Sequence, residues 1–463
     1  MRWKKATAAA AAGSAVLLGL AACSSSGGSN AASSPPAGNS SSPSSAPSST
    51  GSSTTLSGDC APYSQYAGHS GTTVTAFGSV LSPESNSLES SWSKFEQCTG
   101  ITIKYTGSNT FESDLPTKVS GGNAPDLAFI SQPGLITQMV ETGQAKQPSA
   151  QTVANEANWS ADWKTYGSVG GTFYAAPLDA NMKSMVWYSP KFFSDNGYTV
   201  PTTWADLMTL SDKIAADGKA LPWCGGIGSG TASGWPATDW LEEIVLGKEG
   251  GQVYDDWIAG KVKFSDPQIQ DAMTVLKNWM LNPKYVGNVK AIATTTFQNA
   301  GLPILKNQCA MLQQANFYEA QWPKGTKVGP DGDVNAFYLP SAGSTTDPVE
   351  GGGEFDLAFS DRPEVQAVQD YLSSTAWAES RISVAQGWVS ANEKVDQSLY
   401  KDPIDQLSAK YLADPSATFR FDASDAMPAA VGSGQEWKSM VDWFSGTKDQ
   451  KQVAADIDAS WPK

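Results

Sequence analysis

Hydrophobic residues after about position 59 recur at two spacings, one typical of strands and the other of helices. Short apolar or alternating runs predict strands at 74–77, 101–105, 126–130, 173–177 and 184–188. Residues Leu88, Trp92 and Phe95 lie on one helical face, and comparable patterns predict helices at 88–97, 111–119, 135–141, 204–216, 269–280, 363–377, 436–444 and 452–461. Because strands and helices alternate, we expect an α/β fold with parallel-rich sheets. Thr203 is expected to cap the helix that follows it.

The amino terminus has a different pattern. Arg2, Lys4 and Lys5 precede an uncharged, largely apolar stretch at 6–22, which has the length of a signal-peptide core and is shorter than the ~20 apolar residues of a membrane-spanning helix. The stretch ends in Leu-Ala-Ala-Cys at 20–23 and resembles a bacterial lipobox. We therefore predict a lipoprotein signal peptide at 1–22 and a lipid on Cys23. The alternative is an ordinary signal peptide with an incidental cysteine.

Residues 24–58 carry no charge, are dominated by Ser, and contain Leu56 as their one large aliphatic side chain. Such a segment buries too little apolar surface to offset its chain entropy. A flexible coil of this length has an r.m.s. span of roughly 30–35 Å. We predict a disordered tether at 23–58 that holds a folded body away from a membrane. An O-glycosylated stalk is the alternative.

Composition excludes several classes of function. The chain has 463 residues, a net charge of −15 and 46 acidic against 31 basic residues, which argues against a nucleic-acid partner because phosphate binding needs a basic face. The single histidine, His69, falls in a polar turn and is expected to be exposed. With only one histidine, the chain cannot form a His-rich metal site. We predict no metal and no cofactor.

Five motifs carry a family resemblance and keep one order along the chain. They are FEQCTGI at 95–101, VSGGNAPDLA at 119–128, YAAP at 174–177, MVWYSPKFF at 185–193 and GYTVPTTW at 197–204. Together they resemble the carbohydrate-type extracellular solute-binding proteins (family 1) of bacterial ABC importers. Three further segments resemble the α-glucoside-binding branch of that family, WCGG at 223–226, GWPATDW at 234–240 and FDASDAMPAAVG at 421–432.

The resemblance implies a two-lobe clamp of the periplasmic-binding-protein-like type II fold, with each lobe a sheet flanked by helices. It places three inter-lobe crossings near Pro177, Gly351–Gly353 and Ser390–Asn392. The expected amino-terminal lobe is 59–178 plus 352–390, and the expected carboxy-terminal lobe is 179–351 plus 391–463. Glycine suits a crossing because it absorbs large φ/ψ changes. A surface loop is the alternative for the glycine triplet.

Four cysteines remain once Cys23 is assigned to lipid, and an even number fits an exported, oxidising setting. Four cysteines allow three pairings. We favour disulfides Cys60–Cys98 and Cys224–Cys309, because each pair falls within one expected lobe. Buried free thiols are the alternative.

A sugar offers an apolar face of C–H groups and a rim of hydroxyls, so its site needs aromatic platforms and polar groups that hydrogen-bond. The resemblance and the expected loops suggest eleven ligand-binding residues, namely Glu84, Glu112, Gln132, Asn181, Lys183, Trp235, Asp239, Trp240, Phe317, Asp425 and Trp437. Trp235, Asp239 and Trp240 are expected in a loop at the cleft mouth, with a helix start as the alternative. The polar residues have a plain alternative as solvated caps or turns.

An enzyme is the competing class, since glycosidases can be acidic and rich in tryptophan. Glycosidase chemistry needs two carboxylates flanking one bond. The adjacent pairs Glu242-Glu243 and Asp255-Asp256 point apart and are expected on helix surfaces. No nucleophile elbow or phosphate-binding loop occurs. We therefore expect a binding protein and not an enzyme.

We predict a monomeric sugar receptor, lipid-anchored on the outer face of the cytoplasmic membrane, that captures an oligosaccharide and docks on ABC permease subunits served by a separate ATPase. Ligand contacts to both lobes would shift the population toward closure. A receptor for another solute, or a cell-wall glycan adhesin, is the alternative.

Overall fold

The structure is a computed structural model that describes residues 55–343 and 345–462. The predicted signal peptide at 1–22, Cys23 and the tether up to residue 54 lie outside the described residues. Within the described ranges, none of the helices has both the length and the hydrophobicity needed to span a bilayer.

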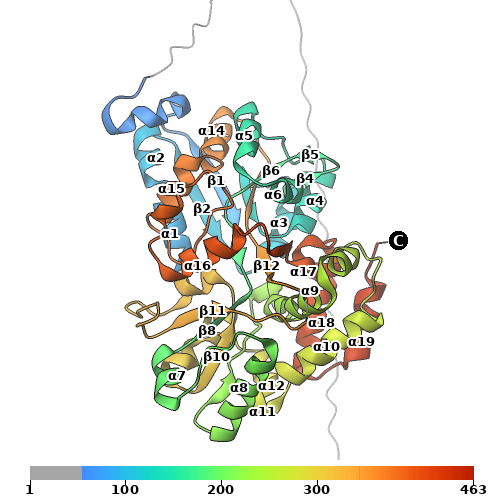
Figure 1. The fold of residues 1–463 in the computed structure, drawn as a ribbon. Coiled ribbons are helices and arrows are strands. Elements are labelled where there is room, and N and C mark those ends of the chain that lie inside the picture. Colours follow the sequence, from blue (N-terminus) through green and yellow to red (C-terminus); the bar gives the residue numbers. More distant parts are fainter. Residues whose placement is uncertain (1–54, 344, 463) are drawn as a thin grey trace, which may run out of the picture. The chain divides into compact units, whose positions relative to one another are not determined.

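The amino-terminal lobe is built on a five-stranded sheet (Figure 1). In spatial order its strands are β2 (Thr102–Gly107), β1 (Thr73–Gly78), β3 (Leu127–Ile130), β13 (Phe355–Ala358) and β6 (Ala175–Pro177). Strand β1 runs parallel to β2 and β3, whereas β13 runs antiparallel to β3 and β6. The sheet is therefore mixed, which corrects the parallel-rich expectation. Strand β13 enters from a late part of the chain, so local β-α-β succession does not set its direction.

Helices and a small hairpin surround this sheet. They are α1 (Glu84–Ser90), α2 (Ser93–Thr99), α3 (Phe111–Ser120), α4 (Pro133–Glu141), α5 (Ala150–Ala154), α6 (Ala161–Tyr166), α14 (Pro363–Leu372) and α15 (Thr375–Ile382), with β4 (Ser168–Val169) and β5 (Thr172–Phe173). Two predicted helices, 88–97 and 363–377, are each split into two. The second split begins at Ser374, whose side chain accepts a hydrogen bond from the Trp377 backbone and starts a new helix.

The carboxy-terminal lobe contains a four-stranded sheet and most of the long helices. Its strands are β11 (Asn335–Tyr338), β8 (Met185–Tyr188), β10 (Cys309–Gln313) and β9 (Leu221–Trp223), in spatial order. Its helices are α7 (Pro190–Asn196), α8 (Trp204–Asp217), α9 (Trp235–Ile258), α10 (Pro267–Trp279), α11 (Pro283–Val286), α12 (Val289–Ile292), α13 (Phe297–Ala300), α18 (Trp437–Ser445) and α19 (Gln450–Ala459). Only β9 and β10 run parallel here, so this sheet is mixed too.

A third sheet has three strands and is here called the hinge sheet. The chain passes through it on its way between the other two sheets. It consists of β14 (Thr418–Phe421), β12 (Pro348–Gly352) and β7 (Asn181–Met182), followed along the chain by α17 (Ala423–Ala426) after β14. The chain passes from β6 to β7 and later from β12 to β13, so both steps join the hinge sheet to the five-stranded sheet. A bridge between Ala180 and Val389 marks a third step, before α16 (Pro403–Leu412).

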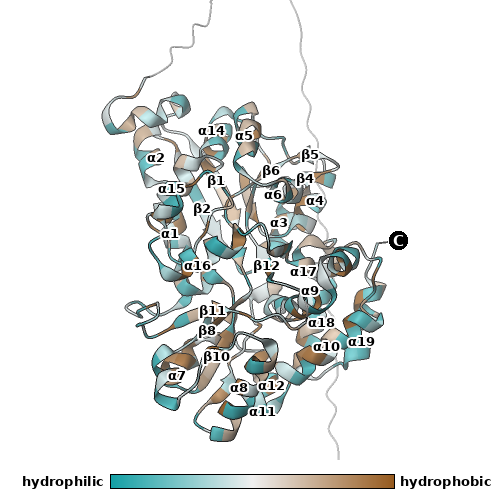
Figure 2. Cartoon of the chain, viewed as in Figure 1, coloured by the Kyte–Doolittle hydropathy of each residue, from teal (hydrophilic) through white to brown (hydrophobic). Residues whose placement is uncertain are grey.

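Local sequence explains how one long helix forms. The Thr203 hydroxyl accepts from the Asp206 backbone at the start of α8, which confirms the predicted cap. Leu207, Leu210 and Ile214 bury the apolar face of this helix. Figure 2 shows hydrophilic colour prevailing on α16 and α19, and most of the large hydrophobic side chains of the described residues are buried. Burial of apolar side chains inside each lobe is the main favourable contribution to the free energy of folding.

Both favoured disulfides are confirmed. Cys60 pairs with Cys98 and Cys224 with Cys309. The first joins the 3-10 helix at Gly58–Tyr66 to α2, and the second joins the end of β9 to β10. Each bridge therefore fixes neighbouring elements of one lobe.

Two expectations about polar residues are corrected. Glu242 and Glu243 are buried and not on a helix surface. The Glu242 carboxylate accepts from the backbone amides of Ala423 and Ser424 and from the Tyr254 hydroxyl, so it holds α17 against α9. His69 is half-buried, whereas an exposed turn was expected.

Candidate functional site

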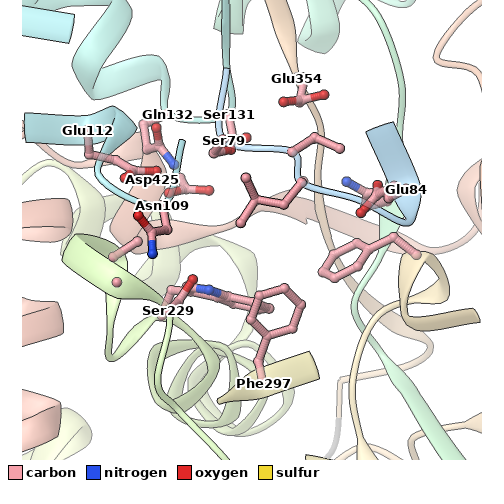
Figure 3. Close-up of a pocket in the computed structure, with 18 of the residues that line it drawn as sticks. Ser79, Glu84, Asn109, Glu112, Ser131, Gln132, Ser229, Phe297, Glu354 and Asp425 are labelled. Carbon is pink, nitrogen blue, oxygen red and sulfur yellow. The ribbon is translucent and has the colours of Figure 1, made fainter. Parts of the chain in front are cut away.

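A cavity of about 240 Å³ opens between the two lobes. Both lobes and the hinge sheet line it, through loops at the ends of strands and the first turns of helices. In Figure 3, Ser79, Ser131 and Gln132 lie on one side, and Ser229 and Phe297 face them from the other. A molecule in this cavity would therefore touch both lobes.

Nine of the eleven predicted site residues line the cavity. They are Glu84, Glu112, Gln132, Asn181, Lys183, Trp235, Phe317, Asp425 and Trp437. Asn181 and Lys183 lie at the end of the short strand β7, and Trp235 is the first residue of α9. The structure thus brings together residues more than 350 positions apart in the sequence.

Trp240 and Asp239 do not line the cavity, which corrects their predicted placement. The expected loop at 235–240 is the beginning of α9, because Pro236 favours a first helical turn. Trp240 points into the core of its own lobe, where its ring lies 5.5 Å from that of Phe444. Asp239 is buried behind Lys183.

One wall of the cavity is aromatic. The Trp235 ring lies 5.1 Å from Phe297 and 5.9 Å from Phe317, measured between centroids. Sequence reasoning missed Phe297, which starts the short helix α13 after a run of threonines. Aromatic faces of this kind offer apolar area to the C–H face of a bound ring.

A cluster of buried charges lies at the floor of the cavity. We call it the Lys183 cluster; its members are Lys183, Asp239, Glu350, Asp422 and Asp425. The Lys183 ammonium lies 2.8 Å from Asp239 and 4.0 Å from Glu350, and it forms a direct ion pair with Asp422. Burial alone lowers the pKa of Lys183, but the neighbouring carboxylates outweigh it and raise that pKa well above its ordinary value.

Asp239, Glu350 and Asp422 are arranged closely enough to hold a metal ion. The Lys183 ammonium already lies within 4.0 Å of all three carboxylates. An ammonium and a divalent cation would repel one another at this spacing. The donor set therefore fits the lysine and not a metal.

Asp425 and Trp437, from the carboxy-terminal part of the chain, also line the cavity. The Asp422 side chain accepts from the Asp425 backbone at 2.8 Å and so starts α17. The Trp437 ring nitrogen donates to Ser424 Oγ at 3.0 Å, which fixes the ring against the same helix. Burial raises the pKa of Asp425, so this side chain favours its neutral form.

A second group of charges, the Arg381 cluster, borders the cavity on the side of the amino-terminal lobe. It consists of the buried residues Asp179, Glu354 and Arg381 and the half-buried Glu84. Burial raises the pKa of Glu84 to about 7 and that of Asp179 to about 6, against the opposing effect of Arg381. Asp179 and Glu354 were missed; they flank two of the predicted crossings, which is the signal that could have found them.

The two lobes touch directly at one edge of the cavity. The Asn109 carbonyl accepts from the Thr231 backbone at 3.0 Å, and Thr231 Oγ1 lies 3.4 Å from Glu112 Oε2. Burial raises the pKa of Glu112 to about 6. Asn109, Glu112 and the neighbouring Gly230 all line the cavity, so this contact forms part of its rim.

Comparison with known proteins gives a consistent set of matches. Residues 81–347 match the family described as bacterial extracellular solute-binding protein. The osmoprotective compounds-binding protein GgtB of Synechocystis sp. is 34% identical over 401 residues, covering 84% of this chain and 92% of that protein. The alpha-glucosides-binding periplasmic protein AglE of Rhizobium meliloti is 34% identical over 407 residues, covering 84% and 87%.

A solved structure shows the same fold. The bacterial solute receptor AcbH, described as having an exclusive preference for β-D-galactopyranose, has a TM-score of 0.72 at 15% identity. The match covers 85% of this chain and 97% of that one. The matched family and both relatives are solute-binding proteins and not enzymes.

Proposed function

This chain belongs to the bacterial extracellular solute-binding protein family, and we propose that it is the sugar-binding component of an ABC importer with an α-glucoside as its ligand. The similarity to AglE supports the α-glucoside. The observation that carries the proposal is the pairing of walls in one cavity: the Trp235–Phe297–Phe317 aromatic wall faces hydroxyl, amide and carboxyl groups. A pyranose needs both kinds of surface at once.

The mechanism is reversible capture. In this proposal one lobe comprises 59–178 plus 352–390 and the other comprises 179–351 plus 391–463. A sugar that touches both lobes only when they are closed binds the closed form more tightly and shifts the population toward it. The closed monomer then docks on permease subunits, and a separate ATPase drives transport. No step changes a covalent bond of the sugar.

Calorimetric titration tests the ligand. The panel is maltose, trehalose, sucrose, cellobiose and xylobiose, with glycine betaine as an osmoprotectant that is not a sugar. We expect the α-linked glucosides to bind and the β-linked cellobiose and xylobiose to bind far more weakly. The similarity to GgtB supports an osmoprotective solute as a second candidate ligand. Binding of betaine, with no binding of any sugar, would favour that candidate. No heat with any sugar would overturn the proposal.

Anchoring is a separate part of the proposal. The lipobox-like run at 20–23 supports a lipid on Cys23, which would hold the protein at the outer face of the cytoplasmic membrane. When the full-length chain is expressed, we expect the processed protein to begin at a diacylated Cys23. The Cys23→Ala variant should be released from the membrane fraction. Intact mass spectrometry of both proteins decides this. A wild-type amino terminus without lipid would contradict it.

A further inference from the structure

We propose that Asp239 and Glu350, which lie behind the cavity and do not line it, are positioning residues that hold the Lys183 ammonium where it binds the ligand. This inference rests on the proposed function, since it concerns the same cavity. The sequence suggested that Asp239 contacts the ligand, whereas this inference places it behind Lys183, without ligand contact. It also gives a role to Glu350, which sequence analysis did not select.

The geometry around Lys183 carries the inference. Lys183 and Asp422 line the cavity, and the lysine side chain is 6% exposed. An ammonium has three protons. The Asp239 and Asp422 carboxylates accept two of them, which leaves one for an oxygen of a molecule in the cavity.

A lysine needs such support because its four-carbon side chain has many rotamers. Fixing that chain before the ligand arrives lowers the entropy lost on binding. The Asp239 carboxylate accepts a hydrogen bond from the ammonium at 2.8 Å, and the ring of the cavity-lining Trp235 lies 5.5 Å from the ammonium. The ammonium is thus held between a carboxylate and the aromatic wall.

Glu350 is the less usual member of this group. It is fully buried, and both of its carboxylate oxygens lack a hydrogen-bond partner in the described part of the chain. Its nearest cation is the Lys183 ammonium at 4.0 Å. The backbones of these two residues are also joined, because the Lys183 amide donates to the Glu350 carbonyl at 2.9 Å. Glu350 therefore acts on Lys183 through its strand and through a neighbouring carboxyl, whose pKa burial raises well above the ordinary value against the opposing effect of Lys183.

The three strands of the hinge sheet each contribute to this arrangement. Lys183 follows β7, Glu350 lies in β12 and Asp422 follows β14. Asp239 comes from α9 in the carboxy-terminal lobe. The ligand-facing ammonium is therefore tied to the strands from which the chain crosses between lobes, and its position depends on their register.

A double-mutant cycle tests the positioning role. The variants are Asp239→Asn, Lys183→Met and the combination, each titrated with the tightest sugar of the panel. We expect Asp239→Asn to raise the Kd about tenfold or more, the usual scale of a lost charge-assisted hydrogen bond. In the Lys183→Met background the same change should alter the Kd by less than about twofold. An equal effect in both backgrounds, or no effect of Asp239→Asn, would overturn the inference.

The matched control is Asp255→Asn in the second segment of α9, beyond the break in the helix at Gly250. Asp255 forms an ion pair with Arg420 at 2.7 Å and does not line the cavity. This variant removes the same charge from α9 without touching Lys183, so its Kd should equal that of the wild type. A comparable loss of affinity in the control would assign the effect to α9 as a whole and overturn the positioning role.

Lys183→Met removes the cluster's cation and can fail to fold, so Glu350→Gln gives an independent measurement. Replacing a buried, unpaired carboxyl by an amide should leave the melting temperature equal or higher, while the Kd rises because Lys183 loses part of its restraint. A merely structural role for Glu350 would lower stability and affinity together. Wild-type protein that binds no sugar would refute the proposed function, whereas wild-type binding with an unchanged Glu350→Gln Kd refutes only the positioning role.

Discussion

The Lys183 cluster and the Arg381 cluster border the same cavity, and they treat buried carboxyls in different ways. In the Lys183 cluster the cation contacts its acids directly, at 2.8 Å for Asp239. Arg381 instead donates to Ser87 Oγ at 2.8 Å and forms no ion pair within 4.0 Å in the described part of the chain. Each cluster has one cation beside several acids, yet only in the Lys183 cluster does that cation pair with them directly. Lys183 holds the pKa of Asp422 below its ordinary value, whereas burial raises the pKa of Asp239 and of Glu84 to about 7 and that of Asp179 to about 6.

The largest expected effect comes from removing each cation in turn. Lys183→Met should lower the free energy of unfolding by about 3–5 kcal/mol at pH 8, because it leaves buried carboxylates without a partner. The loss should be smaller at pH 5, where burial lets Asp239, with a pKa raised to about 7, take up a proton. Arg381→Met should cost less, because its direct partner is a hydroxyl. Urea unfolding at both pH values measures this, and equal losses would erase the distinction between the clusters.

The next effect concerns the ring that lies above Lys183. Trp235→Ala should weaken sugar binding about tenfold to a hundredfold, because it removes aromatic surface from the cavity wall beside Lys183. The melting transition should stay cooperative. Trp461→Ala, which changes a half-buried tryptophan away from the cavity, is the control and should bind normally. An unchanged Kd in Trp235→Ala would remove this ring from the site.

A smaller effect is expected where the two lobes touch. A Cβ on Gly230 would lie 2.0 Å from the Asn109 carbonyl oxygen, so Gly230→Ala should separate the rim and raise the Kd about tenfold. Small-angle scattering should show a larger radius of gyration for this variant without sugar. Gly122→Ala is the matched control: both glycines have positive φ, but a Cβ on Gly122 meets open space. Identical scattering from the two variants would contradict a closed rim.

The smallest effect is a pH dependence from the Arg381 cluster. Burial raises the pKa of Glu84 from an ordinary value near 4.5 to about 7. Between these values the folded chain binds more protons than the unfolded chain, so the free energy of unfolding falls as pH rises through this window and levels off above it. Because Glu84 is half-buried and water screens part of this shift, Glu84→Gln should reduce that fall by about 1 kcal/mol. Exposed Glu89 lies on the same helix, and Glu89→Gln should leave the profile unchanged. Denaturant unfolding from pH 4 to 8 checks both.

Local signals predicted much of the fold. The Thr203 cap, the apolar spacing of α8 and the strand at 73–78 each depend on residues close together in the chain. The two disulfides were predicted because their cysteines fall within one lobe each. The direction of β13 was not predicted, because it depends on where the chain re-enters the five-stranded sheet.

The candidate site was predicted only in part, because only some of its residues lie next to local sequence signals. Phe317 and Trp235 were found because they follow strand and loop signals that resemble a known family. Glu242 and Glu243 were expected at a surface, since adjacent acids on a helix usually face water. They are buried because α17 packs on that part of α9 and supplies backbone amides to Glu242.

By itself the sequence indicated the class of fold, the favoured pairing of its cysteines, the family and nine of the side chains that line the cavity. Only the tertiary structure decided which acids line the cavity and which lie behind Lys183. Lys183 meets Asp239 and Asp422 across 56 and 239 positions of sequence. Periodicity and capping act over a few residues, whereas the burial and pairing of a charge depend on every element packed around it.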